Sequence, residues 1–375
     1  MPNKLIIAAH SVRAYAQAAN VCGYKVVTLD AFADADTRRF AAQFFQIQFD
    51  KQGVDANDFK RVFSKIDLNE VQGFLYGSLF DAQPDLLAWV AARVPLVGNT
   101  PETLQKSKSV DFFKLLNDLA IPHPLTHFER LDCIAEYNEL WLSKRLGGTG
   151  GTHVRQATQA RTGDYYQLKV AGEPVSLLFV ADGVCAQAIG FNRQLVAPTM
   201  DLPYRFAGAV SNLILPKAAQ QSFMHTAQQL TTAFGLRGIN SLDAILHGET
   251  LWILELNPRL SATFNLYSNL LPVHIQGCSG VLSELPDNPL AKAELIIFAD
   301  EDLTVPANFD WPNWVADIPY VKTATSGVNI SLNVPICSVL AEAETADLAH
   351  QLVIQRAEVL KRKLLKEEMA RKGNE

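Results

Sequence analysis

Two carboxylates and an amide occur close together in a region that reads as a pair of adjoining strands. Residues 238–246 and 250–257 are separated by only three residues, a spacing that predicts an antiparallel hairpin. Asp243 then falls opposite Glu255 to within one residue, and like charges that face each other across a sheet repel. Because hard oxygen donors on a rigid hairpin suit Mg²⁺, we expect Asp243, Glu255 and Asn257 to bind this ion.

Alternation along the second strand places Ile253 on the same face as Glu255 and Asn257. Arg259 follows at once and is held by Pro258. Its planar guanidinium suits a phosphoryl group or a substrate carboxylate. The structural alternative is that Glu255 forms an ordinary salt bridge with Arg259 or with a lysine.

A glycine-rich loop follows a predicted strand at residues 140–144. Lys144 leaves this strand just before the loop, which places a cation beside a row of unobstructed backbone N–H groups, where phosphates can lie. The pattern is neither a P-loop nor a dinucleotide-binding fingerprint, so the expected phosphate site is of another type. The alternative is a flexible glycine turn. The loop contains Gly147, Gly148, Thr149, Gly150 and Gly151.

The elements that must position these residues read as an α/β (α+β) chain in three parts. Residues 1–105 start with a βαβ pattern and are expected to form a parallel sheet flanked by helices, including one at 36–45. Residues 106–185 begin with a helix at 108–119 and continue as short strands and glycine turns. Residues 186–375 contain the predicted hairpin and a terminal helix at 346–365.

Composition narrows the class of protein. The 375 residues carry a net charge of -6, with 48% hydrophobic residues, so a buried core is expected and a nucleic-acid partner is not. The sequence shows neither a signal peptide nor a membrane helix, and a cytoplasmic location is expected. The five scattered cysteines argue against a disulfide framework or a zinc site. They are Cys22, Cys133, Cys185, Cys278 and Cys337.

The order of these features resembles the ATP-grasp superfamily over the chain to about residue 285. The resemblance implies an ATP-grasp fold and an enzyme that uses ATP and Mg²⁺. It implies that Lys108 and Lys144 hold the α- and β-phosphates under a glycine-loop lid, and that Arg259 contacts the γ-phosphate. Lys144 and Arg259 would thus be catalytic. Backbone groups of the hinge around Gln167, Leu168 and Val170 would bind adenine, and Glu173 would bind the ribose.

Two positions depart from the family pattern. Ser107 stands where relatives often have Asp before the first lysine, and Gln167 replaces the usual hinge Glu. Within the superfamily the chain resembles predicted carboligases related to biotin carboxylase and, more distantly, tyramine–glutamate ligase. Members of that group accompany methanopterin- and methylofuran-type one-carbon metabolism in methylotrophs. The resemblance rests on residues 238–243, 257–263 and 335–341.

The resemblance implies a carboxylate–amine ligase that forms an amide through an acyl phosphate, with glutamate or another amino acid as one candidate substrate. The alternatives are a bicarbonate-using carboligase that works through carboxyphosphate and a non-catalytic ATP sensor. Small-molecule acids and amines are the expected partners, and a homodimer is the assembly considered. Candidates for the acceptor site are Arg193, Arg205, His274 and Cys278, whose alternative roles are solvated arginines, a core histidine and a packed thiol.

Overall fold

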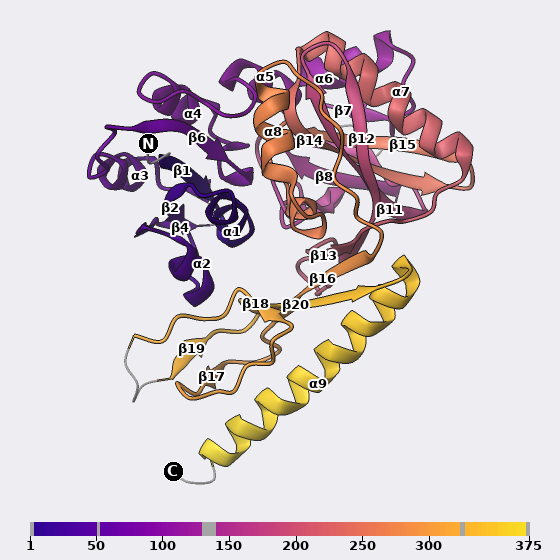
Figure 1. The fold of residues 1–375 in the computed structure, drawn as a ribbon. Helices are drawn as coiled ribbons and strands as arrows, with labels where there is room; N and C mark the ends of the chain where they lie inside the picture. The colour runs from indigo at the N-terminus through magenta and orange to yellow at the C-terminus, as the bar shows by residue number, and fades with distance from the viewer. Residues whose placement is uncertain (1–3, 51–52, 130–139, 323–326, 373–375) are drawn as a thin grey trace.

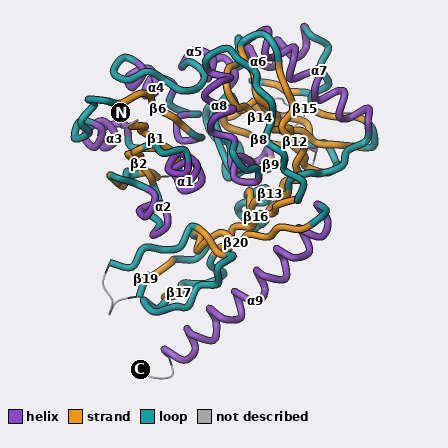
Figure 2. The backbone as a smooth tube through the Cα atoms, in the orientation of Figure 1, coloured by secondary structure: helices purple, strands orange, loops and turns teal. Residues whose placement is uncertain are grey.

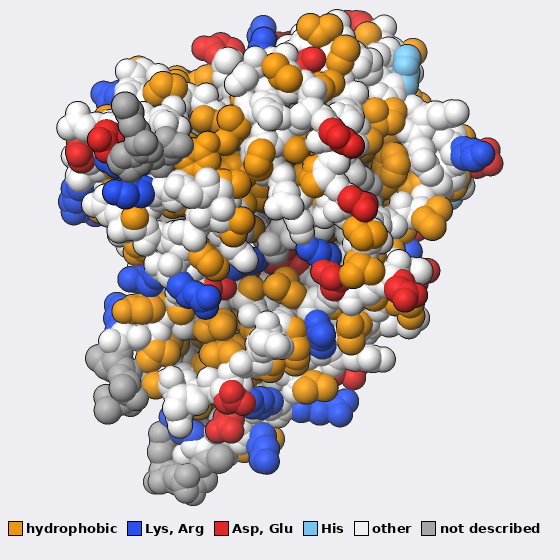
Figure 3. Space-filling view, in the orientation of Figure 1, with side chains coloured by type: hydrophobic (Ala, Val, Ile, Leu, Met, Phe, Trp, Pro, Cys, Tyr) orange, Lys and Arg blue, Asp and Glu red, His pale blue; other side chains and the backbone are white. Residues whose placement is uncertain are grey.

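A computed structural model describes residues 4–50, 53–129, 140–322 and 327–372. Three main sheets with packed helices make up this part, and Figure 1 shows the long carboxy-terminal helix along one side of the molecule. Cys133 lies outside the described residues, and the other four cysteines are free thiols. Within the described ranges, every helix is too short or too polar to cross a lipid bilayer. On the face seen in Figure 3, acidic and basic side chains are interspersed.

The amino-terminal sheet is parallel, with the strand order β3-β2-β1-β6. The predicted βαβ start is confirmed, because β1 and β2 are buried apolar strands joined by α1. The elements of this part are β1 (Lys4–Ala9), α1 (Arg13–Val21), β2 (Lys25–Asp30), α2 (Ala35–Phe40), β3 (Gln43–Gln46), β4 (Phe49–Asp50), β5 (Gly53–Val54), α3 (Ala56–Phe63), β6 (Val71–Tyr76), η1 (Ser78–Phe80) and α4 (Pro84–Ala91).

The predicted helix at residues 36–45 is wrong in its second half. Helix α2 ends at Phe40, and Ala41 has an extended backbone. Residues 43–46 instead pair in parallel with β2, and Phe45 packs against the apolar core beneath that strand. Pairing with an exposed sheet edge and burial of Phe45 therefore override the local helical pattern.

The helix predicted at residues 108–119 is confirmed as α6 (Val110–Asp118), and a separate helix that was not predicted, α5 (Pro101–Ser107), precedes it. The Thr100 hydroxyl accepts from the Thr103 N–H at the start of α5, and Ser109 caps α6 in the same way. Lys108 and Ser109 are the two residues between these helices. The Lys108 side chain consequently leaves the chain at a helix junction instead of lying along a helix face.

A small sheet with the order β7-β10-β8-β9 follows. It contains Lys144 near the end of β8 and the glycine loop between β8 and β9. The short strands predicted here are present, and they pair in antiparallel fashion. Its elements are β7 (Thr126–His127), β8 (Trp141–Arg145), β9 (Arg155–Gln156), η4 (Ala157–Gln159) and β10 (Asp164–Leu168).

An eight-stranded sheet with the order β15-β14-β11-β12-β13-β16-β20-β18 forms the rest of the framework. The boundary expected at residue 185 falls between β11 and β12, which pair within this one sheet. Figure 2 shows that the segment around β17 and β19 consists largely of loops. The elements are β11 (Glu173–Asp182), β12 (Ala186–Val196), β13 (Phe206–Val210), α7 (Lys217–Phe234), β14 (Arg237–His247), β15 (Thr250–Asn257), η5 (Ala262–Leu266), α8 (Leu270–Cys278), β16 (Ala291–Phe298), β17 (Leu303–Val305), β18 (Val315–Ala316), β19 (Val328–Ile330), β20 (Pro335–Ala343) and α9 (Ala346–Lys372).

The side chain of Asn99 connects the amino-terminal part to the hairpin of the large sheet by hydrogen bonds. Its side-chain amide donates to the carbonyls of Arg237 and Pro258, both at 3.1 Å, and to the Asn240 side chain at 2.8 Å. Its side-chain oxygen accepts from the Arg237 N–H at 2.8 Å. Tyr76, at the end of β6, donates to the Asn99 carbonyl. One buried amide thus sets the distance between β6 and the ends of the two hairpin strands.

We predict that Asn99→Ala lowers the free energy of unfolding by about 2–4 kcal/mol, because it leaves several buried polar groups without partners. Urea denaturation followed by circular dichroism measures the change. Asn57→Ala is the matched control, because Asn57 is exposed and should be nearly neutral. Equal stabilities for the two variants would contradict the assigned role of Asn99.

Candidate active site

Strands β14 and β15 bring the two predicted metal-binding carboxylates into direct register. Asp243 is the cross-strand partner of Glu255, so both side chains lie on one face of the sheet. The register then shifts, so that Ala244 pairs with Ile253 and Leu254 is the extra residue of a bulge. The predicted position of Ile253 is therefore wrong. The bulge turns Ile253 to the opposite face, where it is buried in the same apolar cluster as Ala244.

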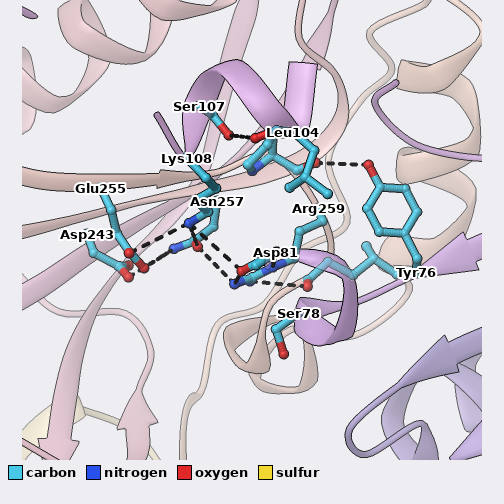
Figure 4. A network of polar contacts seen from close by, with 12 residues as sticks. Tyr76, Ser78, Asp81, Leu104, Ser107, Lys108, Asp243, Glu255, Asn257 and Arg259 are labelled. Atoms are coloured by element: carbon cyan, nitrogen blue, oxygen red, sulfur yellow. Dashed lines mark hydrogen bonds and ion pairs between the residues drawn. The ribbon is translucent and has the colours of Figure 1, made fainter. Parts of the chain in front are cut away.

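Asn257 lies between the carboxylates and two cations (Figure 4). Its amide nitrogen donates to Asp243 Oδ2 and to Glu255 Oε1, each at 3.0 Å. Its Oδ1 accepts from Lys108 Nζ and from Arg259 Nη2, each at 2.8 Å. The structure thus joins five residues that the sequence analysis singled out, drawn from the α5–α6 junction and from both strands of the hairpin and its end.

Arg259 is held by Asp81, which the sequence analysis did not identify. Its Nε and Nη2 donate to the two carboxylate oxygens of Asp81 at 3.2 and 2.7 Å, a bidentate pair in which the Asp81 side chain is 1% exposed. Asp81 directly follows η1, beyond the carboxyl end of the parallel strand β6. That position was the available sequence signal, because polar residues at such strand ends commonly face a ligand crevice.

The electrostatics of the carboxylate pair favour a cation. Burial, and then the charge of Glu255, raises the pKa of Asp243. Burial works in the same direction on Glu255, but the positive charges of Lys108 and Arg259, together with the hydrogen bond from Asn257, outweigh it and lower the pKa of that carboxyl. Glu255 also forms an ion pair with Lys108 at 3.6 Å, as the structural alternative anticipated.

Lys108 is shared with Asn257 and lies 3.9 Å from Asp81, so it does not neutralise the carboxylates by itself. Gln194, which the sequence analysis missed, donates to Asp243 Oδ1 at 2.9 Å. Two facing carboxylates with one adjacent amide fit Mg²⁺, which takes few protein ligands and completes its shell with water and phosphate oxygens. Asp243 and Glu255 would hold such an ion, with the Asn257 amide turned to present its oxygen.

Lys144 is buried in the small sheet beside the carboxylate pair. Its ammonium donates to Gln167 Oε1 at 2.6 Å, and Gln167 in turn donates to the Thr126 hydroxyl. Burial lowers the pKa of Lys144 to about 8, although the negative charges of Glu255 and Asp243 oppose the shift. Gln167 thus positions the lysine by a neutral contact, and the lysine has no carboxylate within ion-pair distance among the described residues.

The glycine loop is closed against two other parts of the chain. A Cβ on Gly147 would lie 2.5 Å from the Asp81 carbonyl oxygen, and one on Gly151 would lie 1.8 Å from the Tyr204 carbonyl oxygen. The Phe206 N–H donates to the Gly150 carbonyl at 2.9 Å. Gly147 and Gly151 also have left-handed φ values. The glycines therefore permit close backbone approach as well as an unusual conformation.

His153, directly after the loop, is a further residue that the sequence analysis missed. A Cβ on Gly148 would lie 2.2 Å from its ring, so the imidazole lies against the loop. Its Nδ1 is buried and has no hydrogen-bond partner within the described ranges. Burial lowers the pKa of His153 to about 4, with the charge of Glu255 opposing and that of Lys144 adding to the shift. A neutral imidazole thus lies near the carboxylates and both lysines.

The predicted adenine hinge lies at the end of β10. The Leu168 N–H is bonded to the Leu125 carbonyl and the Lys169 N–H to the Leu140 carbonyl. The Val170 N–H has no backbone partner among the residues that the structure describes. Of the amides in this hinge, that of Val170 is thus the one left for a ligand, and the role of the hinge stays a prediction.

Glu173 and Arg193 are not brought to the carboxylate pair. Ser176 pairs with both Asp243 and Asn192, so Glu173 and Arg193, at odd spacing from these, lie on the opposite face of the sheet. There the two form an ion pair, which Asp347 extends. The predicted ribose contact of Glu173 and acceptor contact of Arg193 therefore do not fit their places in the fold.

His274 is a buried core residue and Cys278 is a half-buried thiol packed beside it, which are the structural alternatives considered for them. His274 Nδ1 accepts from the Ile239 N–H at 2.9 Å, and Nε2 lies 3.0 Å from the Val97 carbonyl. Burial lowers the pKa of His274 to about 4 and raises that of Cys278 to about 12. Arg205 also lies away from the carboxylates, stacked on Phe298.

We predict that Lys144→Met raises the free energy of unfolding at pH 7 by about 1–2 kcal/mol. The folded-state pKa of Lys144, about 8, is below its ordinary value of 10.5, so its charge disfavours folding at neutral pH. This penalty is full below pH 8 and disappears as the pH rises to about 10.5. Urea denaturation at pH 7 and pH 10 measures the change.

The gain from Lys144→Met should therefore shrink at pH 10. Lys65→Met, at an exposed lysine, is the control and should show no such pH dependence. A loss of stability in Lys144→Met at pH 7 would mean that the hydrogen bond to Gln167 outweighs the burial of the charge.

Comparisons with known proteins bear on the fold. Residues 106–263 match the family model of the ATP-grasp domain. No curated protein matches the chain in sequence. Among solved structures, the chain is similar to Rhizobium etli pyruvate carboxylase, with 15% identity and a TM-score of 0.73 over 95% of this chain. The match covers 37% of the length of the pyruvate carboxylase chain.

Two further structures match over most of their own length. One is the biotin carboxylase domain of Hydrogenobacter thermophilus 2-oxoglutarate carboxylase with MgADP and bicarbonate, at 11% identity and a TM-score of 0.71 over 93% of this chain and 88% of that one. The other is L-amino acid ligase from Bacillus licheniformis, at 12% identity and a TM-score of 0.67 over 94% and 96%. The predicted fold is confirmed: residues 106–263 match the ATP-grasp domain, and nearly the whole chain shares the fold of these carboxylase and ligase structures.

Proposed function

We propose that this protein is a Mg²⁺- and ATP-dependent ligase that joins a carboxylate to an amine. The observation that carries the proposal is the pairing of Asp243 with Glu255 next to Lys108 and Arg259. Carboxylates that favour a cation and basic side chains that suit phosphate thus lie side by side in one partly buried network. This is the arrangement that a metal–triphosphate complex requires.

In the proposed reaction, a substrate carboxylate oxygen attacks the γ-phosphorus of ATP in line. The bond from that phosphorus to the β–γ bridging oxygen breaks, and ADP leaves. The amine then attacks the acyl carbon of the acyl phosphate and releases inorganic phosphate with loss of a proton. The chain needs no nucleophile of its own, so catalysis would consist of positioning and of neutralising charge on the phosphoryl group.

Each charged residue of the site would have its own role in this reaction. Lys108 and Lys144 would neutralise the α- and β-phosphates, and Arg259, oriented by its bidentate contact with Asp81, would bind the γ-phosphoryl oxygens. Asp243 and Glu255 would hold Mg²⁺, which would supply positive charge to the phosphates. The closed glycine loop would keep water from the acyl phosphate.

The acid and the amine substrates are proposed as chemical classes. The sequence resemblance supports glutamate or another amino acid as one substrate, and a role in the synthesis of a methanopterin- or methylofuran-type one-carbon cofactor. The ATP-grasp domain and the similarity to an L-amino acid ligase structure are compatible with amide formation by such a substrate.

Release of ADP and phosphate from Mg-ATP tests the proposal. The purified protein is incubated with pools of amino acids, amines and pterin or furan precursors, and one pool should raise release well above the background rate. Glu255→Gln should lower turnover by at least about 100-fold, because a carboxylate of the metal site is lost, while the affinity for ADP without metal changes little.

Lys65→Met serves as the control in this assay and should turn over normally. Binding of ATP with no stimulation by any pool would favour the sensor alternative over the ligase. Stimulation by bicarbonate alone would favour the carboxyphosphate alternative. Unchanged turnover in Glu255→Gln would refute the metal assignment.

Closure of the glycine loop gives a separate prediction. Gly150 and Gly151 both have a left-handed backbone, with φ of +63° and +68°, but a Cβ on Gly150 meets nothing within 4 Å. Alanine at either position therefore causes similar backbone strain, while Gly151→Ala also clashes with the Tyr204 carbonyl. We expect Gly151→Ala to reduce ATP turnover at least about tenfold more than Gly150→Ala. Equal losses would mean that contact with Tyr204 is not needed for turnover.

A further inference from the structure

A cavity of about 490 Å³ lies apart from the carboxylate pair, where the loop between β12 and β13 faces the end of β16 and helix α9. Figure 1 shows α9 running alongside β13, β16 and β20 at this place. The walls combine a polar end with apolar side chains. The polar end includes Thr199, Arg205 and Asn333, and the apolar walls include Ile296, Leu332 and Ile354.

Arg205 is a buried charge without a counter-ion. It is 7% exposed, and its guanidinium lies 3.7 Å from the centre of the Phe298 ring. Within the described ranges no carboxylate is within ion-pair distance of it. Asp300 is the acid that interacts electrostatically with Arg205, but its carboxylate is paired with Lys361 at 2.9 Å. Desolvation of a guanidinium that lacks a counter-ion is unfavourable, so this arrangement favours an anion.

Neutral groups hold the Arg205 guanidinium in one orientation. Nε donates to the Ala197 carbonyl at 3.0 Å, and Nη1 donates to the carbonyl and side-chain oxygens of Asn333 at 3.4 and 3.2 Å. Nη2 has no hydrogen-bond partner in the part of the chain that the structure describes. Nε and Nη1 of the guanidinium are therefore held in place, whereas Nη2 is available to a ligand, as in a preorganised carboxylate site.

We propose that this cavity binds a small monocarboxylate with an apolar body, whose carboxylate pairs with Arg205. The apolar walls suit the body of such a ligand, and the volume is that of a small-molecule site. Asp300, Glu358 and Lys361 also line the cavity, and Lys361 is paired with Asp300, so among the lining residues Arg205 is the cation that lacks an ion pair and suits a ligand with one negative charge.

The same loop connects this cavity with the glycine loop. Arg205 lines the cavity, while its neighbours Tyr204 and Phe206 contact Gly151 and Gly150. An anion that pairs with Arg205 would therefore shift the conformation of the loop between β12 and β13, against which the glycine loop closes. By reciprocity, ATP would change the affinity for the anion. This coupling rests on the proposed function, whereas binding of the anion does not.

Hexanoate is the probe, and hexanamide is its uncharged match. Isothermal titration calorimetry on the whole chain should detect hexanoate at least about tenfold more strongly than hexanamide. Ile354 is 39% exposed at the cavity wall, so its substitution should not impair folding. Ile354→Glu should weaken hexanoate binding about tenfold relative to Ile354→Gln, and Ile354→Lys should strengthen it, because the added charge repels or attracts the carboxylate.

Equal heats for hexanoate and hexanamide, or equal affinities for hexanoate in Ile354→Glu and Ile354→Gln, would overturn the anion site. For the coupling, hexanoate at a concentration that half-saturates the native chain should change its ATP dissociation constant at least about threefold, and the same concentration should have a much smaller effect on Ile354→Glu. Binding of hexanoate without that change would refute the coupling alone. A chain that binds hexanoate but no ATP would refute the proposed function and leave the anion site standing.

Discussion

The bidentate ion pair between Asp81 and Arg259 is the interaction on which the rest of the site depends. It joins the loop after β6 to the end of the hairpin, and both side chains are buried. With two of its nitrogens fixed, Arg259 presents Nη2 to Asn257, whose amide then faces Asp243 and Glu255. Breaking a buried pair of this kind leaves an uncompensated charge, which is strongly destabilising. The orientation of the network thus follows from one contact between distant parts of the chain.

In the network around Asn257, positive and negative side chains are paired with one another. A ligand that binds one of these charges therefore affects its partner. Lys108 contacts both Glu255 and Asn257, so a triphosphate that takes this lysine leaves the carboxylates with less positive charge. A metal ion that binds the carboxylates releases the lysine in turn. Binding of metal and of phosphate should therefore favour each other. The glycine loop contacts the carbonyl of Asp81, so the residue that orients Arg259 also supports the closed loop.

Much of the fold and part of the site could be predicted from local pattern. The buried strands β1 and β2, the hairpin and the facing of Asp243 and Glu255 follow from apolar runs, a short turn and strand alternation. The rest required knowledge of pairing at a distance. Strand β3 forms because an edge of the parallel sheet is available to it, and Ile253 changes face because of a one-residue bulge. Neither feature has a local signature.

By itself the sequence determined the chemical types and their order: a strand lysine before a glycine loop, then an aspartate, a glutamate, an asparagine and an arginine on a hairpin. Only the tertiary structure decided which partners those groups have. Asp81 reaches Arg259 across 178 positions of the chain, and Arg193 pairs with Glu173 on the far face of the sheet. The physical reason is that residue type and spacing fix local geometry, whereas ion pairs and burial depend on which surfaces the fold brings together.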